Sequence, residues 1–175
     1  MKKRLIAVLM LITMLICLAS CRAARSDLKF YVLKKADVAE NMADSALLAA
    51  AKSRGRVAFT GEDLRGWYWP DHQVLLRDLS VRGGAQEGGS QIFQAEAGDL
   101  FILALGNRII YVGGFSAAED TLGETKEIYI EDGAADNFAV ACRNEYDAEQ
   151  DPRNVDALYD YLAEYDLLSG VKEGE

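Results

Sequence analysis

The sequence predicts an α+β domain with a small antiparallel sheet of about four to six strands, a helix near its N-terminus and another at its C-terminus. Short apolar runs separated by turn residues are typical of strands joined as hairpins. Apolar residues at helical spacing occur near the two ends of the chain rather than between the strands. Because helices and strands do not alternate, a doubly wound parallel sheet is disfavoured.

Length and composition agree with one globular domain. The chain has 175 residues, of which 50% are hydrophobic and 27% charged, enough to enclose one core. Its formal net charge of -9 argues against nucleic-acid binding, which requires a basic face. One histidine and three cysteines exclude most zinc sites and any scaffold of several disulfides. We therefore expect no metal and no cofactor.

The first 20 residues have the composition of a secretory signal peptide. Lys2, Lys3 and Arg4 form a basic start, and residues 5–18 contain no charge. This apolar run is shorter than the roughly 20 residues that a membrane-spanning helix needs. A basic start, a short apolar segment and small residues after it predict export and removal of residues 1–20.

The apolar run ends in the tetrapeptide Leu18-Ala19-Ser20-Cys21. In sequence, position and flanking residues it resembles the lipobox of bacterial lipoproteins. In that family the cysteine thiol receives a diacylglyceryl group, and the chain is cut before the cysteine. The resemblance implies that Cys21 is the lipid attachment point and that Leu18, Ala19 and Ser20 are recognition residues. An ordinary signal peptide and an uncleaved anchor helix are the alternatives.

A lipid on Cys21 implies a protein exported to the outer face of the bacterial cytoplasmic membrane. Two acyl chains give stable attachment, whereas one chain binds a bilayer only marginally. Residues 21–27 would form a polar tether, 28–170 the single folded domain and 171–175 an acidic tail. Without residues 1–20 the chain has 16 Lys+Arg against 28 Asp+Glu, so the lipid has to supply the membrane affinity.

The first elements of the domain are a strand and a helix. Residues 28–33 (LKFYVL) are apolar and aromatic, which predicts a strand. Apolar residues near helical spacing predict a helix over 36–52, with its end at Arg54 and Gly55.

Short elements follow this helix. A strand is predicted at 56–59, and Thr60 is a candidate cap for a turn of helix over 62–64. Pro70-Asp71 predicts a turn, and residues 73–79 predict the next strand.

The best hairpin in the chain joins residues 100–105 to residues 108–112. Gly106-Asn107 between them tolerates the positive φ angles of a tight turn. Both strands are almost continuously apolar, so we expect them at the centre of the sheet. Residues 127–130 and 137–143 are two further candidate strands.

The C-terminal helix is predicted to begin at Asp151, a favourable N-cap, with Pro152 at its first position. Ser169-Gly170 is expected to end it. The apolar stripe of this helix consists of Val155, Leu158, Tyr159, Leu162 and Tyr165.

The folded part of the chain is also similar to a group of small lipoproteins from Gram-positive bacteria. The similar stretches are 59–69, the hairpin at 100–115 and Asp151-Pro152-Arg153-Asn154, and the resemblance extends loosely over about half of the mature chain. The resemblance implies no activity, because none is assigned to that group.

The most distinctive cluster consists of Trp67, Tyr68, Trp69 and His72, which contain both tryptophans and the one histidine. One interpretation is an aromatic platform for a sugar ring, a peptide or a protein partner. The alternative is core packing at a bend of the chain. The platform predicts that Trp67 or Trp69 is substantially exposed, and burial of both would remove it.

Negative charge is concentrated in the last third of the chain. Residues 117–175 contain 4 Lys+Arg and 17 Asp+Glu, a net charge of -13. Such a face can attract a basic partner, or it can simply keep an exported protein soluble. Cys142, without a disulfide partner once Cys21 is acylated, is expected to be a small buried residue rather than a reactive thiol.

Three functions compete. The first is a lipid-anchored, non-enzymatic binding or interaction domain whose ligand, a protein or a cell-wall component, is unidentified. The second is a structural or regulatory lipoprotein whose acidic face meets a basic partner. The third is an envelope hydrolase, which would use His72 or a carboxylate pair. We expect no catalytic residues, because the sequence contains no complete catalytic set.

Overall fold

The computed structural model describes residues 25, 27–39, 42–77, 93, 95, 98–115, 127–132, 137–147 and 149–170. Within these residues the chain forms a mixed sheet of nine strands, accompanied by two longer helices, which confirms the α+β class. The predicted sheet of four to six strands was too small. The strands are β1 (Leu28–Leu33), β2 (Arg56–Thr60), β3 (Leu64–Tyr68), β4 (Gln73–Leu76), β5 (Leu100–Leu105), β6 (Arg108–Gly114), β7 (Ile128–Asp132), β8 (Asn137–Cys142) and β9 (Leu168–Ser169).

The strands lie in the order β2-β1-β5-β6-β7-β8-β4-β3-β9. The β5–β6 hairpin is as predicted, and it lies inside the sheet, where both strands have neighbours on either side. The sheet is mixed and not antiparallel throughout, because β6 pairs with β7 and β3 pairs with β9 in parallel, whereas the other pairs are antiparallel as predicted. These two pairings join segments that no short turn connects.

The two strands absent from the prediction are β3 and β9. In β3 the apolar pattern is broken by Arg65 and Gly66, where the pairing with β4 also shifts register. Strand β9 has two residues, too few to produce a periodic pattern, and it pairs with Trp67 and Tyr68. A pattern read along the chain cannot reveal such a pairing.

The helices begin later than predicted. Residues 35–37 form a short 3-10 helix, and α2 extends over Asp44–Arg54 instead of starting at residue 36. Helix α4 extends over Asp156–Glu164, so Asp151 is not its N-cap and Pro152 is not its first residue. Residues 61–63 form a turn rather than a helix, in which the Asp63 carboxylate accepts from the Thr60 amide and hydroxyl.

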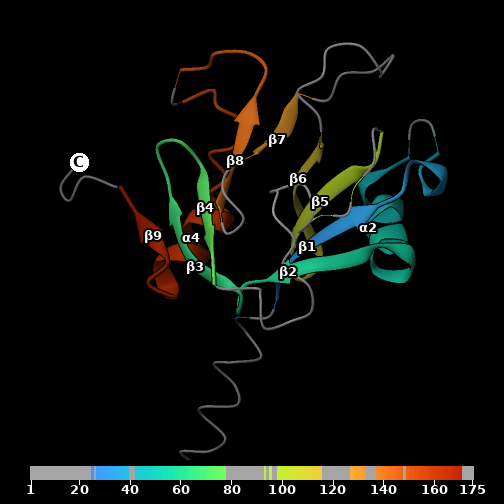
Figure 1. Cartoon of the computed structure of the whole chain (residues 1–175), viewed down its shortest axis with the longest axis horizontal. Helices are drawn as coiled ribbons and strands as arrows, with labels where there is room; N and C mark the ends of the chain where they lie inside the picture. The colour runs from blue at the N-terminus through green and yellow to red at the C-terminus, as the bar shows by residue number, and fades with distance from the viewer. Residues whose placement is uncertain are drawn as a thin grey trace, which may run out of the picture.

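The sheet curves around the larger of two apolar clusters (Figure 1). Helix α2 packs on the outside of β1 and β5, and the leucines and alanines of its buried face contact Tyr31, Leu33, Ile102 and Ala104. Helix α4 contributes Leu158, Tyr161 and Leu162 to the larger cluster on the inside.

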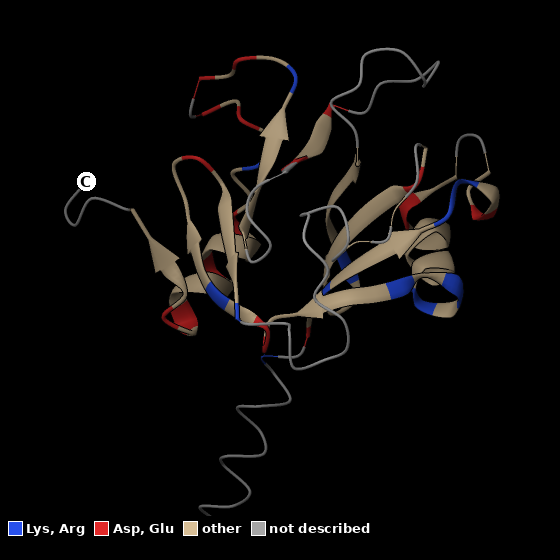
Figure 2. Ribbon diagram, viewed as in Figure 1, with Lys and Arg blue, Asp and Glu red and all other residues tan. Residues whose placement is uncertain are grey.

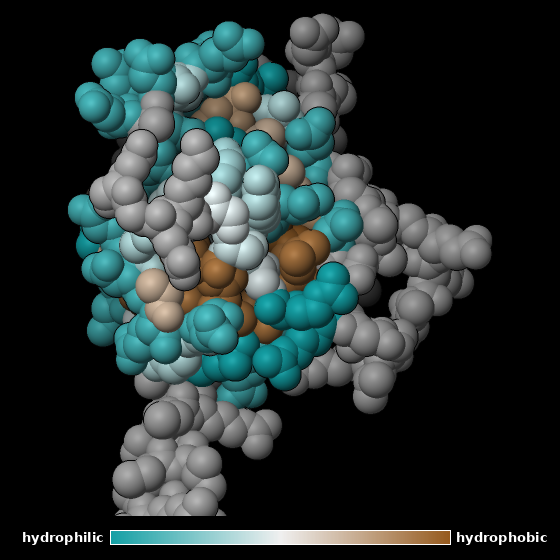
Figure 3. All heavy atoms as spheres, turned by 90° about the vertical axis from the view of Figure 1, so that its left-hand side faces the viewer, coloured by the Kyte–Doolittle hydropathy of each residue, from teal (hydrophilic) through white to brown (hydrophobic). Residues whose placement is uncertain are grey.

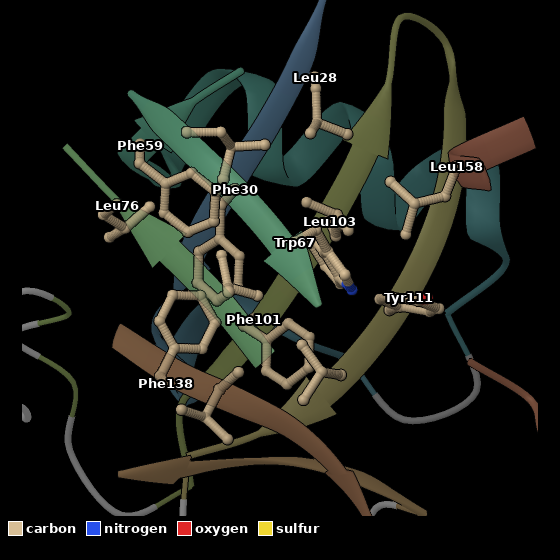
Figure 4. Close-up of a cluster of buried hydrophobic side chains, with 14 of the residues drawn as sticks. Leu28, Phe30, Phe59, Trp67, Leu76, Phe101, Leu103, Tyr111, Phe138 and Leu158 are labelled. Atoms are coloured by element: carbon tan, nitrogen blue, oxygen red, sulfur yellow. The ribbon is translucent and has the colours of Figure 1, made fainter. Parts of the chain in front are cut away.

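All six phenylalanines of the chain lie in the larger cluster or against it. Phe30 is at its centre, with ring centroids 4.7 Å from Phe59 and 5.1 Å from Phe101 (Figure 4). Phe59 belongs to the edge strand β2, yet its ring lies 5.8 Å from that of Phe138 in β8. Contact between strands so far apart in the sheet order shows how strongly the sheet bends. The remaining two, Phe93 and Phe115, also contact Phe30.

Among the described residues, no helix combines the length and the apolar character needed to cross a membrane.

Candidate functional site

The structure separates the four residues of the aromatic cluster. Trp67, in β3, and His72, in the turn before β4, are each 1% exposed. Tyr68 points to the opposite side of β3 and is 37% exposed. Trp69 follows the end of β3 and is partly buried against the core. Trp67 and His72 are therefore buried in the interior, and Tyr68 and Trp69 are the two residues of the aromatic cluster that a partner can reach.

The backbone around His72 fixes its ring. His72 has a φ of 49°, the left-handed region that tight turns use. Its amide donates to the Trp69 carbonyl at 3.2 Å, and its carbonyl accepts from the Val140 amide of β8 at 3.1 Å. These bonds hold the turn against the neighbouring strand.

The His72 ring is buried in a neutral form. Its Nε2 lies 3.1 Å from Oδ1 of Asn154, so Nε2 carries the hydrogen and donates it to the amide oxygen. Its buried Nδ1 has no hydrogen-bond partner among the residues that the structure describes. Burial, followed by the positive charge of Arg153, lowers the pKa of His72 to about 4.

An ion pair holds the segment that carries Asn154. The guanidinium of Arg153 donates from Nε and Nη2 to the Asp151 carboxylate, at 2.9 Å and 2.6 Å, and from Nη1 to the Val140 carbonyl at 3.0 Å. The Tyr111 hydroxyl of β6 donates to the Arg153 carbonyl. Burial raises the pKa of Asp151, but the hydrogen bonds and charge of Arg153 outweigh it and lower the pKa overall. The segment is thus attached to both β6 and β8.

Asp151 lies in a turn and does not cap the last helix. Oδ1 of Asp151 accepts from the Arg153 amide at 2.9 Å, two residues on, as in an Asx turn, and residues 152–155 are not helical. The Asp151 carboxylate therefore accepts hydrogen bonds from both the backbone amide and the side chain of Arg153. The helix accordingly starts five residues later, at Asp156.

Cys142 is partly exposed at the end of β8, not fully buried as expected. Its Sγ lies 4.0 Å from Oδ1 of Asp151. Burial, together with the negative charge of Asp151, raises the pKa of the Cys142 thiol. A thiol in this environment is protonated and weakly nucleophilic at neutral pH.

The environment of His72 does not resemble that of a catalytic base. Within the described part of the chain, the hydrogen-bond partner of its ring is an amide, and its side chain contacts no serine or carboxylate by hydrogen bond. A triad would need an oriented carboxylate and a nucleophile at these two nitrogens. In the same described residues, no group of three His, Cys, Asp or Glu side chains is arranged to hold a metal ion.

Trp69 and Tyr159 form the accessible part of this region. The Trp69 ring packs on His72 with a centroid separation of 4.9 Å. The Tyr159 ring of α4 lies 5.2 Å from Trp69 at an interplanar angle of 83°. Both residues are partly exposed. Figure 3 shows the side of the molecule on which α4, β3 and β9 lie, where hydrophilic residues surround small hydrophobic areas.

The sequence does not identify three residues of this region as site residues: Arg153, Asn154 and Tyr159. Tyr159 was assigned only to the apolar stripe of the last helix, and the polar pair Arg153-Asn154 has no periodic signal. Their roles arise from tertiary contacts: Arg153 with Val140, Asn154 with His72 and Tyr159 with Trp69.

Comparison with protein-family models, with curated proteins and with solved structures finds no match to this chain. Leu18, Ala19, Ser20 and Cys21 lie outside the described residues.

The titration of His72 has a measurable consequence. Because its pKa is about 4 in the folded chain and about 6.5 when unfolded, the unfolded chain takes up the proton first as the pH falls. We expect the free energy of unfolding to decrease between pH 6.5 and pH 4, by at most about 3 kcal/mol from this group. Urea unfolding at several pH values should show a shallower pH dependence for His72→Asn, since asparagine tolerates positive φ and does not titrate. Identical slopes for the two proteins would contradict this assignment.

Proposed function

We propose that this protein is a lipoprotein of the bacterial cell envelope, anchored to the outer face of the cytoplasmic membrane through a diacylglyceryl group on Cys21. The observation that carries the proposal is the tetrapeptide Leu18-Ala19-Ser20-Cys21 at the end of an uncharged segment that follows a basic start. A spacing and sequence of this kind are typical of lipoprotein processing. The two acyl chains would supply the stable attachment that an acidic domain lacks.

The start of the folded part suits a chain that enters from an anchor. The Arg25 guanidinium donates to the Gly61 carbonyl at 3.0 Å and to the Leu64 carbonyl at 3.1 Å. The Tyr161 hydroxyl of α4 donates to the Arg25 carbonyl at 2.5 Å. The chain is therefore attached to the domain four residues after Cys21, so the lipid would keep the domain close to the bilayer.

The folded domain is, in this proposal, a non-enzymatic binding or interaction module. Its support is the arrangement around the turn at 69–72, where buried Trp67 and His72 hold Tyr68 and Trp69 at the surface. Aromatic side chains fixed in this way are common in the energetically important part of protein interfaces. The environment of His72 weighs against the hydrolase alternative.

A second candidate function is a structural or regulatory lipoprotein that meets a basic partner through its acidic face. Figure 2 shows acidic residues on α4 and on the loop after β8, whereas basic residues gather on α2 and β2. Among the described residues from 127 onward, 11 are acidic and 2 are basic. A charge distribution of this kind steers positively charged molecules toward one end of the protein.

The anchor is tested by Cys21→Ser. We expect the wild-type chain, produced in a bacterium that processes lipoproteins, to sediment with membranes and to need detergent for release. The serine variant cannot form the thioether, so it should lose essentially all of this membrane association. Ala24→Ser, a change of similar size three residues further on, is the matched control and should behave as wild type. Equal sedimentation of wild type and Cys21→Ser would disprove the lipid anchor.

A further inference from the structure

We propose that Trp69 and Tyr159, with the carboxylates of Asp71 and Asp156 beside them, bind a positively charged side chain of a protein partner. This surface is called the Trp69 corner below. The inference rests on the proposed binding function and names the chemistry of the partner, a segment rich in arginine or lysine.

The geometry of the two rings favours a cation. Their planes meet at 83° with centroids 5.2 Å apart, an edge-to-face pair in which the two ring planes form a right-angled corner. A cation within about 6 Å of a ring face is attracted by the electron density of that face, and tryptophan is the strongest of the aromatic residues in this respect. Aromatic side chains arranged around a ligand recognise quaternary ammonium groups in other proteins.

The charges around the rings favour the same ligand. Asp71 follows Trp69 by two residues, and Asp156 lies three residues before Tyr159 on α4, where side chains share one face. Both carboxylates are exposed, and neither forms a salt bridge with another described residue. They are therefore available to a partner, in contrast to Asp151, whose charge is taken up by Arg153.

Trp69 is held in place by a backbone hydrogen bond and by the neutral ring of His72. The Trp69 amide donates to the Ser169 carbonyl at 3.0 Å, and its ring packs on the buried ring of His72. Burial keeps the His72 ring neutral at physiological pH, so this ring adds no positive charge beside the tryptophan. A ring that is already fixed loses little conformational entropy when a partner binds.

The experiment uses the full chain in neutral detergent and a hexa-arginine peptide as the probe. Trp67 is enclosed in the core, so a change in tryptophan fluorescence during the titration reports on Trp69. We expect saturable binding that weakens as salt concentration rises. The double variant Asp71→Asn/Asp156→Asn should bind about tenfold more weakly, because it removes both charges from the Trp69 corner.

The matched control is Asp147→Asn/Glu149→Gln, which removes the same charge from the exposed loop after β8. It should change the affinity less than about twofold, because neither side chain is close in the sequence to Trp69 or Tyr159. Equal weakening by the two double variants would show general attraction to an acidic surface and would overturn the proposal. So would the absence of any peptide binding to the wild-type chain.

The aromatic contribution is measured with Trp69→Leu and Trp69→Phe, using peptide labelled with a fluorophore because the intrinsic signal is lost. Leucine should weaken binding by about tenfold, and phenylalanine, which keeps a ring, should weaken it less. Unchanged affinity in Trp69→Leu would overturn the proposal. Tyr159→Leu provides the same test if the Trp69→Leu variant unfolds.

The result is independent of the membrane anchor. A lipidated wild-type chain that fails to bind the peptide would disprove the Trp69 corner and leave the lipoprotein assignment intact. A chain that binds the peptide at this surface but carries no lipid would support the Trp69 corner and disprove the lipid anchor.

Discussion

Phe30→Ala should destabilise the folded chain by about 3–5 kcal/mol, the range measured for removal of a buried phenylalanine ring. Phe30 is 1% exposed and contacts the rings of the other five phenylalanines. Removing it leaves a cavity at the point where the bent sheet meets itself, between β2 and β8. Denaturant unfolding followed by circular dichroism measures the loss.

The control for this prediction is Val57→Ala in the neighbouring strand β2. Val57 is 44% exposed, so truncation should change the unfolding free energy by no more than about 0.5 kcal/mol. A similar loss for the two variants would mean that the phenylalanine cluster is not the centre of the core.

Gly113→Ala should also destabilise the chain strongly, by about 2–3 kcal/mol. A methyl group on Gly113 would overlap the Ile128 carbonyl oxygen and the Phe101 ring. The first of these is a backbone atom of the adjacent strand β7, so relief requires β6 and β7 to move apart. The same denaturant titration, with the loss of sheet signal as its readout, measures the effect.

Gly114 provides a matched control in the next position of the same strand. A methyl group there meets no atom within 4 Å. Gly114→Ala should therefore be close to neutral, although the two substitutions are chemically identical. If Gly114→Ala proved as damaging as Gly113→Ala, the close approach of β6 and β7 would be wrong.

Strands with a strong local pattern were predictable from the sequence. The hairpin of β5 and β6 has two long apolar runs around Gly106-Asn107, and Gly106 does have the positive φ that such a turn requires. Strand β1 begins and ends at the predicted residues, Leu28 and Leu33. In these cases the neighbouring residues alone determine the conformation.

The parallel pairings and the start of α4 were not predictable in the same way. Strand β9 forms because Leu168 pairs with Trp67 of β3, about a hundred residues earlier in the chain. Asp151 and Pro152 have the local chemistry of a helix start, but Arg153 binds the Asp151 carboxylate and connects the segment to β8. Tertiary contacts outweighed local preference at both places.

The candidate site was predictable only where its residues are neighbours in the chain. The sequence identified Trp67, Tyr68, Trp69 and His72 as a group, because they are close together in the chain. It did not show which of them face the solvent, nor that Tyr159 completes the surface from another element. Those facts depend on where α4 packs.

Intact-mass spectrometry of the protein extracted from bacterial membranes is the most direct test of the central proposal, which is anchoring through Cys21. We expect a chain that starts at Cys21, with residues 1–20 removed and the added mass of a diacylglyceryl group on the first residue. An unmodified polypeptide that still begins at Met1 would contradict it.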